Sequence, residues 1–134
     1  LCSKKYSFLG FVIFSMAKHN ELGQKGEEIA ADFLEKAGYA ILERNWVFQK
    51  AELDIVAQKD NILAIVEVKT RTSADFGLPQ DFVKGKKIQN LVKAVDQYMT
   101  ENDLDLEVRF DIIGIVLNSQ ETSIEHIEDA FYYF

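Results

Sequence analysis

The sequence contains few of the residues that build disulfides, zinc sites or membrane spans. Its 134 residues include one cysteine, Cys2, so no disulfide can form within the chain. Neither this cysteine nor the two histidines occur at zinc-finger spacing. The single proline, Pro79, leaves the segments on both sides uninterrupted. The longest apolar run is too short to cross a bilayer, so we predict no membrane association.

Positive charge is also scarce. Lysine and arginine number 15 against 22 acidic residues, which gives a formal net charge of −7. Because phosphate affinity depends on lysine and arginine, this balance argues against a generally basic nucleic-acid binder. Nucleic-acid binding would have to come from a local site, for instance one whose carboxylates are neutralised by cations. The 48% hydrophobic content and the length predict one ordinary globular domain.

The first fifteen residues differ in character from the rest. Two lysines precede the apolar run at residues 6–14, a pattern typical of a signal peptide. We favour the alternative that Met16 is the true start and that residues 1–15 are an upstream extension or a disordered leader. This interpretation predicts a cytoplasmic protein with one domain at 16–134, whereas a secreted protein is the competing hypothesis.

Hydrophobic periodicity predicts two helices and five strands. Apolar residues at helical spacing predict helices over 21–37 and 84–100. Strands are predicted over 39–48, 51–58, 62–70, 107–117 and 123–128, with a loop at 72–81. The order α-β-β-β-α-β-β predicts an α/β fold with a mixed central β-sheet flanked by helices.

The second and third predicted strands form a hairpin that carries acidic residues. A two-residue turn at Asp60-Asn61 sets a register in which Asp54 lies opposite Glu67. Directly opposed residues have Cβ atoms about 4.5–5.5 Å apart. Glu52 then lies opposite Lys69, and since side chains alternate between faces, all four project to one side.

Two opposed carboxylates repel each other unless positive charge lies between them. The hairpin is otherwise apolar on both faces, where charges are costly unless paired or metal-bound. A hard cation such as Mg²⁺ or Mn²⁺ suits Asp54 and Glu67, and Lys69 could position water or stabilise phosphate charge. The competing interpretation is a structural ion-pair network of these acids with Lys69 and Arg71, which geometry alone makes equally plausible.

The helices add further candidates. Glu27 lies at the edge of the apolar stripe of the first helix and could lean toward the acids. An ordinary exposed acid in the first turn is the alternative. Lys84, Lys86 and Lys87 could form a phosphate-contacting edge on the second helix, although a solvated face is the interpretation we favour.

Two features near the carboxyl terminus each allow two interpretations. Arg109 and Asp111 share one face of a strand and could pair with each other, or Arg109 could face the acids. The apolar tail at residues 131–134 could pack on the domain or on a second subunit, so a homodimer is one hypothesis.

An ordered set of motifs resembles the uncharacterised bacterial YraN-like family. The acidic strand followed by Glu-Val-Lys also resembles the core of PD-(D/E)xK nucleases. The matching segments are Gly23 to Ala31, Gly38-Tyr39, Arg44-Asn45, Glu52-Leu53-Asp54-Ile55-Val56, Val66-Glu67-Val68-Lys69-Thr70-Arg71, Arg109-Phe110-Asp111 and Ala130-Phe131. The family usually has glycine where this chain has Ala51. The segments are spread along residues 16–134, so the resemblance extends over almost the whole domain.

The resemblance implies a restriction-endonuclease-like fold similar to Holliday-junction resolvases. It implies Mg²⁺- or Mn²⁺-dependent hydrolysis of DNA, branched or single-stranded, with Glu27, Asp54 and Glu67 as metal ligands and Lys69 as the catalytic lysine. Candidate accessory residues are Glu52, Arg71, Arg109 and Asp111. The alternative is a catalytically silent module on the same fold that binds nucleic acid or protein.

Overall fold

The computed structural model describes residues 8–73 and 85–130, with side chains described from residue 21 onward. Its elements follow the predicted order, α-β-β-β-α-β-β. They are α1 (Phe8–Lys36), β1 (Ala40–Phe48), β2 (Ala51–Lys59), β3 (Ile62–Arg71), α2 (Gly85–Glu101), β4 (Glu107–Leu117) and β5 (Thr122–Ile127). Lys84, the tail at 131–134 and most of the predicted loop lie outside the described residues.

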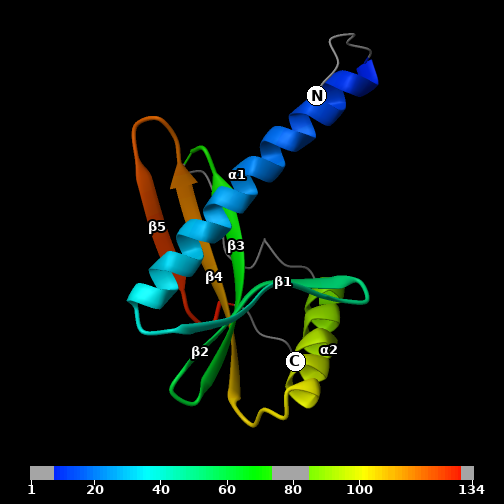
Figure 1. Cartoon of the computed structure of the whole chain (residues 1–134), viewed down its shortest axis with the longest axis vertical. Helices are drawn as coiled ribbons and strands as arrows, with labels where there is room; N and C mark the ends of the chain where they lie inside the picture. Colours follow the sequence, from blue (N-terminus) through cyan, green and yellow to red (C-terminus); the bar gives the residue numbers. More distant parts are fainter. Residues whose placement is uncertain (1–7, 74–84, 131–134) are drawn as a thin grey trace.

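The predicted elements are confirmed to within a few residues, except at the start of α1. This helix begins at Phe8 instead of residue 21, so it continues through the segment that the sequence set apart. Figure 1 shows this amino-terminal part extending beyond the sheet. In the described part of the chain, neither helix combines the length and apolar character needed to cross a membrane.

The five strands form one mixed sheet in the order β1-β2-β3-β4-β5. Neighbouring strands are antiparallel except β3 and β4, which run parallel and are joined through α2. A parallel pair needs such a crossover connection, because a tight turn reverses the chain. The predicted α/β fold with a mixed, helix-flanked sheet is therefore confirmed (Figure 1).

Each helix covers one face of the sheet and closes its own apolar cluster. Leu63 and Ile65 of β3 belong to the cluster that contains the buried face of α2. Ala64 and Val66 belong to the other cluster, together with α1. This alternation explains why β3 is apolar from Ile62 to Val66, since a strand covered on both faces lacks a polar side. It also assigns each β3 residue to the α1 face or the α2 face.

A close approach fixes where α1 crosses β3. A Cβ atom at Gly26 would overlap the Thr70 hydroxyl group, so only glycine fits at this crossing. Glu27 follows Gly26 directly and is thereby held beside the carboxyl end of β3. The helix therefore delivers an acid to the end of the strand that also carries Glu67 and Lys69.

The hairpin of β2 and β3 keeps the predicted register and then opens. Backbone pairing runs from Lys59–Ile62 to Ile55–Val66, as the predicted turn requires. The predicted pairings of Asp54 with Glu67 and of Glu52 with Lys69 are wrong as backbone pairs, because the ladder ends before them. Beyond this point the Asp54 Oδ2 atom accepts a hydrogen bond of 3.0 Å from the Val68 N–H.

The sheet is irregular where the hairpin opens. Leu53 and Ile55 are two residues apart in β2, yet Leu53 packs in the α2 cluster and Ile55 in the α1 cluster. On the neighbouring strand, Asn45 has a left-handed φ of 54°. Its neighbours Arg44 and Trp46 pair with Ile55 and Leu53, so both irregularities occur at the same level of the sheet. Such breaks redirect side chains, and this one redirects the chain at Asp54.

Candidate metal centre

A polar pocket lies where β2 and β3 separate, under the first turns of α2. Its volume is about 270 Å³. The residues that line it are Lys50, Ala51, Glu52, Asp54, Glu67, Lys87, Asn90 and Leu91. Asp54 and Glu67 thus open onto one cavity on the same side of the sheet. The predicted meeting of these two acids occurs, although through the opening of the hairpin and not through its ladder.

Asp54 is held in a strongly unfavourable environment for negative charge. Burial and the Glu67 carboxylate raise the pKa of Asp54 from 3.8 to about 7, against the lowering effect of the Val68 N–H. The carboxylates of Glu27 and Glu52 raise this pKa further. The pocket therefore concentrates negative charge that a bound cation would stabilise.

Glu67 is buried, and one of its carboxylate oxygens is already paired with two ammonium groups. The Lys87 ammonium lies 2.8 Å from Glu67 Oε2, and the Lys69 ammonium lies 3.3 Å from the same atom. Glu67 is only 9% exposed, so these ion pairs offset much of the cost of burying its charge. Lys69 lies close to the acids, as predicted. Lys87 is a second partner of Glu67, which the predicted hairpin register alone did not indicate.

Glu27 lies near the acids, as the edge of the apolar stripe suggested. Burial raises its pKa, the side chain of Asn45 counteracts this, and the carboxylates of Glu52 and Glu67 raise it again. Its neighbour Glu28 is exposed. The two adjacent glutamates of α1 therefore have different surroundings, one beside the pocket and one in solvent.

The donor set consists of carboxylate oxygens, which suit a hard divalent cation. Among the side chains described, at residues 21–73 and 85–130, no three acidic, histidine or cysteine side chains are already gathered as a metal-binding cluster. Asp54 Oδ2 accepts a hydrogen bond from the Val68 N–H, and Glu67 Oε2 contacts two lysines. These residues fit a divalent cation in type and charge, and a cation at Glu67 Oε2 would compete with the two ammonium groups.

The other candidate residues near the pocket are more exposed to solvent. Glu52 lines the cavity but is exposed. Arg71 is exposed and donates a 3.1 Å hydrogen bond to the Thr70 carbonyl oxygen. Lys86 is exposed as well, although it precedes Lys87 in the same helical turn. Only Lys87 of the predicted lysine edge lines the pocket among the described residues.

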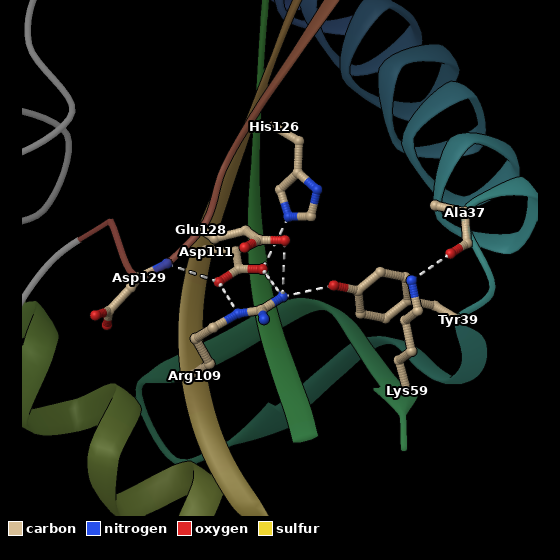
Figure 2. A network of polar contacts seen from close by, with 8 residues as sticks. All are labelled: Ala37, Tyr39, Lys59, Arg109, Asp111, His126, Glu128 and Asp129. Carbon is tan, nitrogen blue, oxygen red and sulfur yellow. Dashed lines mark hydrogen bonds and ion pairs between the residues drawn. The ribbon is translucent and has the colours of Figure 1, made fainter. Parts of the chain in front are cut away.

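Arg109 and Asp111 lie on the opposite face of the sheet. Asp111 pairs with Val66 in the parallel β3–β4 ladder, and paired residues share a face, here the one covered by α1. The guanidinium binds both carboxylate oxygens, with Nε 2.9 Å from Oδ1 and Nη2 2.8 Å from Oδ2 (Figure 2). The interpretation that these residues pair is confirmed. The alternative that Arg109 faces the acids is wrong, whereas an accessory role of Arg109 and Asp111 stays a prediction.

Asp111 is fully buried and satisfied by several donors (Figure 2). His126 Nε2 lies 2.8 Å from Oδ2, and the Asp129 N–H donates to Oδ1 at 3.0 Å. Burial alone would raise the pKa of Asp111, but hydrogen bonds from His126 and Arg109 hold it below its ordinary value. Arg109 also donates to the Tyr39 hydroxyl oxygen at 2.6 Å. This network ties β4, β5 and the start of β1 together.

Nothing in the sequence pattern alone joins His126 to Asp111, and the β4–β5 pairing reveals this contact. Ile113 pairs with His126 in that antiparallel hairpin, which places the imidazole diagonally across from Asp111. Predicting the register of this second hairpin would have found the contact. Lys87 could not have been found in this way, because its position depends on how α2 packs on the sheet.

Comparison with known proteins identifies the family. The model of an uncharacterised protein family, UPF0102, matches residues 26–115. A UPF0102 protein of Flavobacterium psychrophilum is 66% identical over 119 residues, which cover 89% of this chain and 100% of the relative. Relatives from Flavobacterium johnsoniae and Phocaeicola vulgatus are 60% and 50% identical, each over at least 87% of this chain and 97% of the relative. As the motifs had indicated, the chain belongs to the UPF0102 family.

Proposed function

We propose that this protein is a metal-dependent nuclease that hydrolyses phosphodiester bonds of DNA. The observation that supports this proposal best is that acids from three elements lie near enough to interact electrostatically, beside a lysine. Glu27 comes from α1, Asp54 from β2 and Glu67 from β3, and the Lys69 ammonium lies 3.3 Å from Glu67. The resemblance to PD-(D/E)xK nucleases and their restriction-endonuclease-like fold adds to it.

In this proposal Asp54, Glu67 and Glu27 hold Mg²⁺ or Mn²⁺. A bound divalent cation would supply Lewis-acid polarisation of the phosphate and a lowered pKa for an attacking water. The half-buried Asp54 carboxylate is fixed by the Val68 N–H, so its second oxygen keeps a defined direction. Lys69 would hold the attacking water or stabilise the charge that develops on the phosphate.

The pocket also has features that suit a DNA strand. Lys50 and Lys87 line it and could contact backbone phosphates next to the reacting bond. The acidic balance of the chain restricts such contacts to this neighbourhood. A branched or single-stranded substrate fits a small local contact area better than a long duplex track does.

A catalytically silent binding module is the second candidate. The observation in its favour is that the acids already have partners: Glu67 has two lysines and Asp54 has the Val68 N–H. A site that is satisfied without metal could persist for stability alone.

Cleavage assays separate these candidates. The purified protein is incubated with branched, single-stranded and linear duplex DNA, with Mn²⁺ or with EDTA. We expect Mn²⁺-dependent cleavage that falls at least 100-fold in Asp54→Asn and in Glu27→Gln, since both remove a metal ligand. Glu28→Gln is the matched control, because this exposed neighbour should be dispensable. Failure to cleave any of these DNAs, with unchanged DNA binding in Asp54→Asn, would support the module.

A further inference from the structure

Two ammonium groups converge on a single oxygen of the acidic pocket. Lys69 and Lys87 approach Glu67 Oε2 at 3.3 and 2.8 Å, while Asp54 Oδ2 accepts a hydrogen bond from the Val68 N–H. The shorter contact belongs to the lysine that comes from the helix. Two ammonium groups thus compete with any metal ion for this oxygen of Glu67.

Lys87 lies at an unfavourable position for a cation, and its contact with Glu67 compensates for this. Lys87 lies in the first turn of α2, which begins at Gly85 and has no acid in that turn. A cation at the amino end of a helix is disfavoured by the helix dipole. The pairing with the buried Glu67 offsets this repulsion, so Lys87 is positioned by the pocket and not by the helix.

The Lys87 side chain is also able to move away from Glu67. Its side chain is 44% exposed, whereas that of Lys69 is 21% exposed. A long side chain at the pocket rim can swing outward while its stem stays in contact with the protein. Lys69 belongs to β3, where it pairs with Gly114 of the parallel strand β4. The exposed lysine is therefore the one that can make room for a metal.

We propose that the Lys87 ammonium acts as a built-in counterion that is exchanged for the divalent metal. This inference rests on the proposed function and concerns the regulation of the same site. In the metal-free protein Lys87 neutralises Glu67, and in the metal-bound protein it is released to contact a nucleic-acid phosphate at the pocket rim. The acidic pocket thereby avoids a large uncompensated charge while it holds no metal.

The exchange predicts that metal and phosphate binding assist each other. Metal binding releases Lys87 for the phosphate, and phosphate binding withdraws Lys87 from Glu67 and favours the metal. Thermodynamic linkage requires the two effects to be equal in size. The residue therefore couples two ligands and also weakens the intrinsic affinity for the metal.

The first test measures Mn²⁺ affinity in the absence of DNA, by titration calorimetry and by electron paramagnetic resonance of free Mn²⁺. We expect Lys87→Gln to bind Mn²⁺ roughly tenfold more tightly than the unmodified protein, since the competing ammonium is gone. Lys86→Gln removes the same charge from the preceding position and serves as the control for general electrostatics. Equal affinities in the two variants, or weaker binding in Lys87→Gln, would overturn the exchange.

The second test measures the coupling. Fluorescence anisotropy follows the binding of a labelled single-stranded oligonucleotide with phosphorothioate linkages, whose length is checked on a gel after each titration. Mn²⁺ should increase oligonucleotide affinity in the unmodified protein and in Lys86→Gln, and should increase it several-fold less in Lys87→Gln. A gain of the same size in all three proteins would refute the release of Lys87 to the phosphate.

The outcomes separate this inference from the nuclease proposal. If the protein cleaves DNA with Mn²⁺ but Lys87→Gln behaves like Lys86→Gln, only the exchange is wrong. If the unmodified protein neither binds Mn²⁺ nor cleaves DNA, both proposals fail together. Circular dichroism of each variant checks that the exposed substitutions leave the fold intact.

Discussion

The ionised Asp54 carboxylate lowers the stability of the folded protein, and the same carboxylate belongs to the candidate pocket. Its pKa is raised to about 7 by burial and by the Glu67 carboxylate, so the folded protein favours the protonated form. Stability from this group is fully present below the unfolded pKa, near 4, and is lost as the pH rises through 7. Negative charge at Asp54 is therefore tolerated near neutral pH at the expense of stability, as is common at functional sites.

This linkage predicts a pH-dependent effect of Asp54→Asn in the presence of EDTA. The amide keeps an acceptor for the Val68 N–H but carries no charge. Thermal unfolding should show that the variant is more stable than the unmodified protein at pH 8, by about 1–4 kcal/mol, with little difference at pH 4. Added Mn²⁺ should reverse the order at pH 8. An equal difference at both pH values would contradict the raised pKa.

Asp111 is the opposite case, a buried charge that is fully compensated. Asp111→Asn should destabilise the protein by about 3–5 kcal/mol, because it leaves Arg109 and His126 without their anionic partner. Chemical denaturation gives this value, and Glu128→Gln is the control, since Glu128 is exposed and 3.7 Å from Arg109. Mn²⁺ affinity should not change in folded Asp111→Asn, because the network lies across the sheet from the pocket. A loss of Mn²⁺ binding there would support an accessory role.

At the level of elements, the crossing of α1 over β3 positions Glu27. Gly26→Ala places a methyl group against the Thr70 side chain, so the helix must shift. We expect a loss of about 1–3 kcal/mol in unfolding free energy and a weaker contribution of Glu27 to Mn²⁺ binding. Gly23→Ala is the matched control, because nothing lies within 4 Å of its Cβ and alanine favours the helix. If both variants gained stability, the close approach would not constrain the helix.

The elements also show what the sequence could predict and why the rest escaped prediction. The hairpin register followed from the turn at Asp60-Asn61, because the length of a turn fixes the pairing of the residues next to it. The opening at Asp54 did not, since Leu53 and Ile55 are both apolar and give no sign that they point to different faces. The contact of Lys87 with Glu67 depends on packing between α2 and β3, which periodicity does not encode. Local patterns thus predicted the elements, and long-range packing completed the site.

At the scale of the whole molecule, the net negative charge disfavours DNA binding, whereas the lysines at the candidate pocket favour it. A chain with a formal charge of −7 repels DNA at long range, so binding must be concentrated where local positive charge is available. The candidate pocket has Lys50 and Lys87 on its lining and Lys69 beside it. A divalent cation bound between the acids would add further positive charge at the same place. DNA affinity should therefore depend on the metal more than on the protein surface.

This balance predicts a shallow salt dependence of DNA binding. Each neutralised phosphate contributes about −0.9 to the slope of log affinity against log salt for duplex DNA, and about −0.7 for single strands. With two or three lysines at the pocket, we expect a slope of about −2 in the presence of Mn²⁺. Anisotropy titrations between 50 and 200 mM KCl, at fixed Mn²⁺, would measure it. A slope steeper than about −5 would require a basic surface elsewhere on the molecule, and the DNA contact would then have to be placed away from the acidic pocket.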